Sequence, residues 1–155
     1  MGDLVKRAIL FAIAFACAAP AWAQSSPTPR ERARIDRVLD RTPLIDGHND
    51  FPDQVKDNFG GDLTRVDLAS DTRQLMPPLH TDIPRLRRGG MGAQFWSVYV
   101  PADLPGAQAG EAVRVQIDLV RQMIARYPAV FEFADTADEI VRIHRRGRIA
   151  SMIGM

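Results

Sequence analysis

Two side chains with metal-binding chemistry stand two positions apart, His48 and Asp50. They follow directly on residues 44–46, a short strand-like run. Because residues i and i+2 of an extended chain point to the same side, an imidazole nitrogen and a carboxylate oxygen can meet there at one ion. This pair of donors suits zinc, although the spacing also admits other divalent metals. The alternative is a surface histidine beside a helix-capping aspartate, since a His-X-Asp triplet is frequent by chance.

His80 and His144 are weaker candidates. His80 comes just before a predicted helix start, where a role in the loop is the default and a role near the site is the alternative. His144 lies on a predicted helix next to two arginines, which favours a solvated helix face. The chain has no nucleophile-elbow serine, no phosphate-binding glycine loop and no HExxH triplet. Metal binding at His48 and Asp50 is therefore the main chemical hypothesis.

The elements that must position this pair alternate along the chain. Apolar runs predict strands at residues 44–46, 91–100 and 148–154, and helical signals occupy 30–41, 82–88, 111–127 and 136–146. Strands that alternate with helices indicate an α/β fold with a parallel sheet and right-handed crossovers. Ligands of such folds bind beyond the carboxyl ends of the strands, where His48 and Asp50 are expected.

Two helix boundaries carry specific signals. Thr136 and Glu139 form a capping-box sequence, in which the threonine caps the helix and the glutamate reaches back. Asp82 is a candidate N-cap that is followed by Pro84 in the first turn. Both patterns predict where a helix begins.

The first 23 residues have the layout of a secretory signal peptide. Lys6 and Arg7 precede an uncharged apolar stretch at residues 8–19, and Ala21-Trp22-Ala23 follows as a cleavage site. The stretch is shorter than the roughly 20 apolar residues of a membrane span. We therefore expect export, with cleavage after Ala23. An uncleaved anchor, or a lipid on Cys17, would instead give membrane association.

Composition excludes several classes of protein. The chain has 155 residues, of which 46% are hydrophobic and 25% charged, as in globular domains. Its net charge of +1 gives no basic excess for binding nucleic acid. Cys17 is the one cysteine and would leave with the signal, which excludes cysteine catalysis and a disulfide framework. Residues 24–29 are expected to be a flexible leader.

Four blocks of the sequence are similar to one protein family. PLIDGHNDFP at residues 43–52 resembles the opening motif of the membrane (renal-type) dipeptidases, peptidase family M19. HTDIPRL at 80–86, GMGAQFWSVYV at 90–100 and RIASMIGM at 148–155 resemble the family's following blocks, in the same order. The similarity spans nearly all of the chain after the signal.

The resemblance implies a (β/α)8 TIM barrel of the metal-dependent hydrolase type, with two zinc ions and dipeptide substrates, including those with a C-terminal D-residue. His48 and Asp50 match two ligands of one zinc. The family's bridging glutamate would follow Met155, and its other ligands and catalytic groups lie further on. We therefore expect residues 30–155 to be the N-terminal part of a truncated barrel, about three β/α units, with no catalytic residue and no activity of its own. The full-length family protein could be a homodimer.

Two alternatives remain. One is another barrel hydrolase of the amidohydrolase type, although such enzymes more often carry His-X-His on the first strand. The other is an exported binding module without enzymatic activity.

Overall fold

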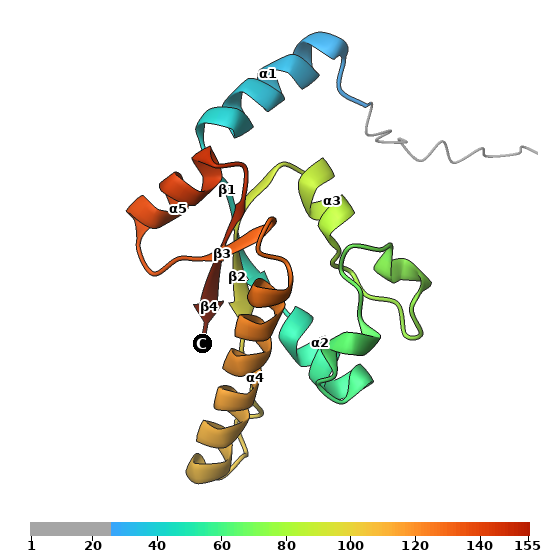
Figure 1. The fold of residues 1–155 in the computed structure, drawn as a ribbon, viewed down its shortest axis with the longest axis vertical. Coiled ribbons are helices and arrows are strands. Elements are labelled where there is room, and N and C mark those ends of the chain that lie inside the picture. Colours follow the sequence, from blue (N-terminus) through green and yellow to red (C-terminus); the bar gives the residue numbers. More distant parts are fainter. Residues whose placement is uncertain (1–25) are drawn as a thin grey trace, which may run out of the picture.

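The computed structural model describes residues 26–155, so the predicted signal peptide and Cys17 lie outside the described residues. The elements run in the order α1 (Pro29–Arg41), β1 (Leu44–Asn49), α2 (Phe51–Phe59), the 3-10 turns η1 (Leu63–Arg65) and η2 (Thr72–Gln74), α3 (Ile83–Arg88), β2 (Met91–Ser97), α4 (Gly106–Arg126), β3 (Phe131–Phe133), α5 (Ala137–Arg145) and β4 (Ile149–Gly154). The strands form one parallel sheet in the order β1-β2-β4-β3 (Figure 1). The predicted α/β fold with a parallel sheet is confirmed.

The prediction of three strands is wrong, because the described residues contain a fourth one, β3. β3 pairs with the first half of β4, where Phe131 lies opposite Ile149. Three residues are too few for a strand pattern to be recognised in a sequence. The strand forms because the chain turns after α4, where the carbonyl of Tyr127 accepts hydrogen bonds from the amides of Val130 and Phe131.

Local signals account for most helix boundaries. The predicted capping box of α5 is present, since Thr136 Oγ1 accepts from the amide of Glu139 and the Glu139 carboxylate accepts from the amide of Thr136. Asp82 caps α3 through a hydrogen bond from the amide of Arg85. In contrast, α4 begins at Gly106, earlier than the predicted residue 111. Its first turns hold small residues that allow a helix but carry no apolar repeat.

Helices cover both faces of the sheet. On one face α2 and α4 enclose the larger core, in which Trp96 of β2 packs edge-on against Phe51 and Phe131, with ring centroids 5.9 and 5.8 Å apart. On the other face α5 packs Ile143 against small side chains of β2 and β4. Figure 1 shows α5 on one side of the strands and α2 and α4 on the other. The larger core therefore holds the first turn of α2, directly after β1.

The pairing of β1 with β2 is irregular in two places. At the start, a Cβ on Gly92 would lie 2.7 Å from the Cα of Pro43, so only glycine allows this close approach. At the end, Asp46 pairs with Gln94 and Asn49 pairs with Trp96, so β1 uses one residue more than β2. This is a β-bulge, which re-aims side chains at the end of a strand. The bulge places the two residues between Asp46 and Asn49 at the rim of the sheet.

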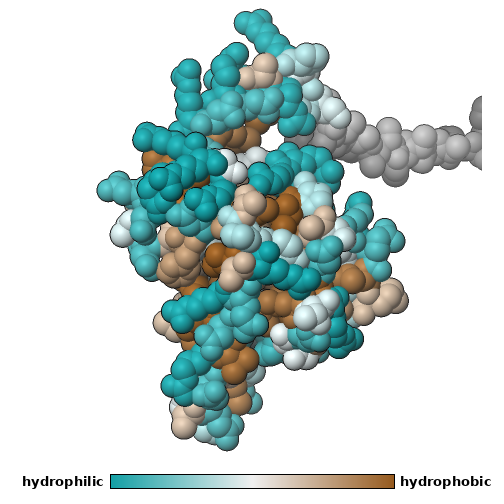
Figure 2. Space-filling model, in the orientation of Figure 1, coloured by the Kyte–Doolittle hydropathy of each residue, from teal (hydrophilic) through white to brown (hydrophobic). Residues whose placement is uncertain are grey.

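The first helix is the least buried element. α1 buries none of its residues, and its apolar side chains Ile35 and Val38 are 40% and 55% exposed. Figure 2 shows mainly hydrophilic side chains on the visible face of this helix. Across residues 26–155, every helix is either too short or too polar to cross a bilayer.

Candidate metal site at the carboxyl end of the sheet

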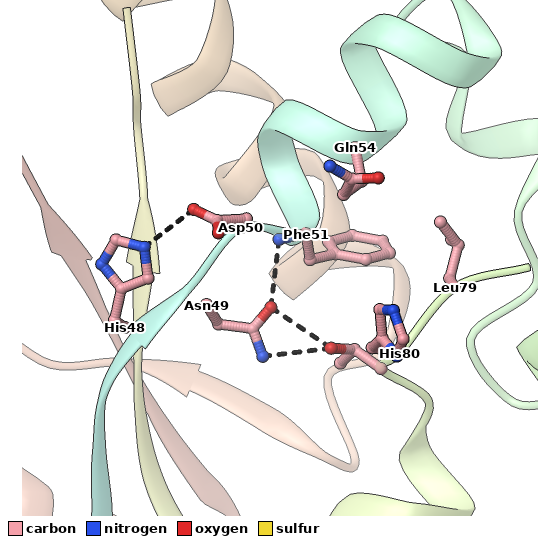
Figure 3. Close-up of a pocket in the computed structure, with 8 residues that line it drawn as sticks. His48, Asn49, Asp50, Phe51, Gln54, Leu79 and His80 are labelled. Carbon is pink, nitrogen blue, oxygen red and sulfur yellow. Dashed lines mark hydrogen bonds and ion pairs between the residues drawn. The ribbon is translucent and has the colours of Figure 1, made fainter.

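His48 and Asp50 meet where β1 ends and α2 begins. The Nε2 atom of His48 lies 2.8 Å from Oδ1 of Asp50, and Figure 3 shows the ring and the carboxylate facing each other. Both side chains are open to solvent, with exposed fractions of 70% and 54%. The structure thus brings the two predicted donors together, through a bulge at Gly47 and His48 and not through regular extended chain. Their role as metal ligands stays a prediction.

Asp50 occupies the N-cap position of α2, but its carboxylate makes no capping hydrogen bond. The structure therefore does not support the alternative of a helix-capping aspartate. The helix is instead anchored by the next residue, Phe51, which is 3% exposed and belongs to the larger core. The backbone of Asp50 is fixed by this neighbour, while its carboxylate remains available to an external partner.

Asn49, which lies between the two donors, points away from them in Figure 3. Its Nδ2 donates to Oγ1 of Thr81 at 3.1 Å and to Oε1 of Gln94 at 3.3 Å. Its Oδ1 accepts from the amide of Phe51 at 3.0 Å. Gln94 is fully buried on β2 and donates to the carbonyl of Asp46. This network ties the end of β1 to β2, to α2 and to the loop before α3.

The second ring nitrogen of His48 has a partner of its own. Nδ1 lies 3.1 Å from Oγ of Ser97, the last residue of β2. Ser97 is 7% exposed, so its hydroxyl is held inside the protein while most of the imidazole is in solvent. The ring is therefore held at both nitrogens, which fixes its plane.

A cavity of about 350 Å³ opens beside the pair. It is lined by His48, Asn49, Asp50, Phe51, Gln54, Leu79, His80 and Thr81. His80 comes from the loop before α3 and lies across Asn49 from His48 in Figure 3. The structure thus places His80 at the candidate site, which from the sequence was the alternative to a simple loop role.

A buried polar cluster holds the loop that carries His80. Asp82 is 1% exposed, and its Oδ2 accepts from Nε of Arg85 at 2.8 Å and from the amide of Thr72 at 3.2 Å. The Nη2 of Arg85 donates to Oγ1 of Thr72 at 2.8 Å and to the carbonyl of Leu79 at 2.9 Å. These bonds close the segment 72–85 on itself and fix the wall of the cavity opposite His48.

His144 takes no part in this site. It lines a separate cavity at the amino ends of β2 and β4, together with Arg145 and Leu39. The predicted solvated position is wrong, because His144 is half-buried and its Nε2 is buried with no hydrogen-bond partner among the described residues. The reason is its neighbour Ile143, which faces the sheet and draws this flank of α5 inward.

His48 and Asp50 are donors of the kind that bind a metal ion, but they are only two. Within residues 26–155, no three or more His, Cys, Asp or Glu side chains are grouped so that they could hold a metal. Two zinc ligands with bonds of about 2.0–2.1 Å at a tetrahedral angle lie about 3.3 Å apart, so the 2.8 Å contact would open by about 0.5 Å. Exposed side chains can make that movement. His48 and Asp50 therefore fit as two ligands of a zinc ion.

Four polar residues that shape the site were missed from the sequence, namely Asn49, Thr81, Gln94 and Ser97. The usable signal was in the apolar run at residues 91–100, where Gln94 and Ser97 are the polar exceptions. Polar side chains in a buried strand need hydrogen-bond partners. The neighbouring end of β1 is where those partners lie.

Comparison with known proteins gives consistent results. The family model described as membrane dipeptidase (peptidase family M19) matches residues 32–155. A curated relative, the dipeptidase ataJ of Aspergillus terreus, is 39% identical over 130 residues, which are 79% of this chain and 30% of that protein. The chain thus spans about a third of the length of this relative.

Solved structures share the fold. A metallopeptidase from Rhodobacter sphaeroides, liganded with a phosphinate mimic of the dipeptide L-Ala-D-Ala, matches with a TM-score of 0.56 at 21% identity, over 73% of this chain and 37% of that one. The dipeptidase AC, a metallopeptidase of family M19, matches with a TM-score of 0.56 at 26% identity, over 73% and 34%. Since the family model covers most of the sequence, the chain belongs to the membrane dipeptidase family, peptidase family M19.

Proposed function

We propose that this chain supplies part of the active site of an exported zinc dipeptidase, in which His48 and Asp50 are two ligands of one zinc ion. The observation that carries the proposal is the 2.8 Å contact between His48 Nε2 and Asp50 Oδ1 beside an open cavity, in a chain of a metallopeptidase family. Membership of this family favours the dipeptidase over the amidohydrolase and the binding module.

The chemistry of the proposed site divides between the metal and the chain. When bound, a zinc pair lowers the pKa of a shared water to about 7 and polarises the peptide carbonyl. His48 and Asp50 would hold the metal, and the buried ring of Phe51 keeps the Asp50 backbone in place. No residue of this chain is assigned as the acid or base that serves the leaving amine.

The cavity suits a small substrate. Its volume of about 350 Å³ lies at the lower end of the roughly 300–1,000 Å³ of ligand pockets. The Rhodobacter sphaeroides metallopeptidase of the same fold is liganded with a mimic of L-Ala-D-Ala. We therefore propose dipeptides as substrates, including those with a D-residue at the C-terminal position.

The metal site is tested by titrating the full chain with zinc and following the ring resonances of its three histidines by NMR. We expect the His48 ring to respond first, and this response to weaken when Asp50 is replaced by alanine. A response confined to His80 or His144 would contradict the proposal. Asp57→Ala is the matched control, because Asp57 is an exposed aspartate of α2 that pairs with Lys56 and does not line the cavity.

Residues 26–155 by themselves are expected to be inactive. A catalytic zinc usually has three protein ligands and one open position, and the described residues bring together only two. The check is to add zinc to the purified chain and assay hydrolysis of L-Ala-L-Ala and L-Ala-D-Ala. Hydrolysis above the buffer background would show that two ligands suffice.

Export is the remaining part of the proposal. It rests on the charged start, apolar stretch and cleavage site within residues 1–23. Expression with this segment intact, followed by mass spectrometry of the product, should give a chain that begins at Gln24. A product that keeps residues 1–23 would point instead to an uncleaved membrane anchor.

A further inference from the structure

We propose that Ser97 is a positioning residue for His48, whose hydroxyl keeps its hydrogen bond to the imidazole by reversing direction when a metal replaces the proton on Nε2. The inference rests on the proposed function, because it assigns a role to Ser97 in the same site. None of the sequence motifs assigns a role to this residue.

In this contact a buried hydroxyl, that of Ser97, holds an exposed ring, that of His48. Ser97 Oγ lies 3.1 Å from His48 Nδ1, and Ser97 is 7% exposed whereas the His48 side chain is 70% exposed. Ser97 is also fixed at its backbone, since it pairs with Gly154 in the middle of the sheet. The hydroxyl is therefore held by a paired strand, and the exposed imidazole takes its orientation from it.

The direction of the hydrogen bonds follows from the groups present. As a carboxylate, Asp50 can only accept, so His48 Nε2 donates to it at 2.8 Å. In a neutral imidazole with its proton on Nε2, the other nitrogen is an acceptor, so Nδ1 receives the hydrogen bond of the Ser97 hydroxyl. In this state Ser97 is the donor.

Metal binding at Nε2 would reverse this arrangement. The nitrogen that faces Asp50 must lose its proton to bind a metal ion, and the neutral ring then carries its proton on Nδ1. That N–H has to donate, so the partner at Nδ1 must now accept. A hydroxyl can do both because it holds one donor and two acceptor sites. An alanine could do neither, and a carbonyl oxygen could serve only the metal-bound state.

The neighbouring strand provides a matched control. Ser151 of β4 is a serine on the adjacent strand, 0% exposed, and its Oγ has no hydrogen-bond partner among the described residues. It lies opposite Gln94, on the other face of the sheet from Ser97. Ser151→Ala therefore removes a buried hydroxyl from the same sheet without touching His48.

The experiment compares Ser97→Ala, Ser97→Thr and Ser151→Ala in the full chain, with urea unfolding to show that each variant is folded. The first readout is the pair of ¹⁵N shifts of the His48 ring without metal, which reports the tautomer. The wild type should show one dominant form with the proton on Nε2. Ser97→Ala should move both shifts toward an average of two forms, and Ser97→Thr should restore the wild-type pattern.

The second readout is the zinc concentration at which the His48 ring responds. Loss of a group that orients a metal-binding histidine typically weakens metal affinity about 10- to 100-fold. We expect such a loss for Ser97→Ala, a recovery for Ser97→Thr and no change for Ser151→Ala. A folded Ser97→Ala variant with wild-type shifts and wild-type zinc response would overturn the inference. If the wild type shows no zinc response at His48, the proposed function fails, and the metal-free shifts still decide whether Ser97 sets the tautomer.

Discussion

Two acid–base pairs in this protein have the same separation and opposite surroundings. In the first pair, Oδ2 of Asp82 lies 2.8 Å from Nε of Arg85. In the second, Oδ1 of Asp50 lies 2.8 Å from Nε2 of His48. Asp82 is 1% exposed, and its two oxygens accept from the side chain of Arg85 and from the amides of Arg85 and Thr72. The Asp50 side chain is 54% exposed, and the ring of His48 is its one hydrogen-bond partner among the described residues.

The difference shows how distance alone misleads about the role of an ion pair. A buried carboxylate must have its acceptor sites filled, and removal of one partner then leaves the others unpaired. An exposed carboxylate with free acceptor sites contributes little to stability and can accept a new ligand. The hydrogen bonds of Asp82 are therefore expected to stabilise the segment 72–85. The pair of His48 and Asp50 is expected to bind a metal ion.

The largest effect is expected for Asp82→Ala. The substitution leaves Nε and the amide of Arg85, and the amide of Thr72, without their acceptor, so the free energy of unfolding should fall by about 3 kcal/mol. Arg85 is partly exposed, which puts the estimate at the lower end of the range for buried pairs. Urea unfolding measures the change. The control is Asp118→Ala, an exposed aspartate 3.9 Å from Arg121, which should stay within about 0.5 kcal/mol of wild type.

Asn49→Ala tests the network that joins the two regions. It removes the hydrogen bonds to Thr81 and Gln94 and leaves Oε1 of the buried Gln94 unpaired, so we expect a loss of about 2 kcal/mol in the free energy of unfolding. Thermal unfolding is the measurement. Asn58→Ala removes an asparagine on α2 that donates only to the exposed side chain of Gln54 and should be nearly neutral. Equal effects of the two substitutions would show that the network adds no stability.

Glu132→Gln should show a smaller effect that depends on pH. A hydrogen bond from Arg142 lowers the pKa of Glu132 in the folded protein, and the charges of Arg142 and Arg148 act in the same direction. Because the folded pKa is below the unfolded one, the stabilisation is present above about pH 4.5 and is lost as pH falls through the folded pKa. The variant should be about 1 kcal/mol less stable at pH 7 and approach wild type in acid. A constant difference between the two proteins across this range of pH would contradict the assignment.

The smallest effect on stability is expected at the candidate site itself. Asp50→Ala removes an exposed carboxylate that neither caps α2 nor contacts the core, so the free energy of unfolding should change by less than about 0.5 kcal/mol. In the same variant the zinc response of His48 should weaken. A large loss of stability would show that the Asp50 pair resembles the Asp82 cluster after all.

The sequence was informative where the structure depends on neighbouring residues. The contact of His48 with Asp50 joins positions two apart, and the capping box of α5 and the N-cap of α3 each join positions three apart. The parallel sheet followed from the alternation of strands with helices. These features need no knowledge of which distant segments meet.

What the sequence did not reveal depends on distant pairs. Asn49 donates hydrogen bonds to Thr81 and Gln94, which are 32 and 45 residues away in the sequence. Ser97, which contacts the ring of His48, is 49 residues away from it in the sequence. The bulge in β1 is visible only against its partner strand. β3 forms because it pairs with the free edge of β4, and its three residues are too few to show a strand pattern. These features depend on which distant segments pair, and the pattern of a single sequence does not show that pairing.

The amide of Phe51 has an unusual position in this arrangement. It lies in the first turn of α2, where helical amides have no partner within the helix, and it donates to Oδ1 of Asn49 at 3.0 Å. Its exchange with deuterated water therefore requires the Asn49 network to open and does not require α2 to unfold. The exchange rate of this one amide thus reports how often the end of β1 loosens beside the two donors. Comparison with amides deeper in α2 would separate motion of the site from unfolding of the helix.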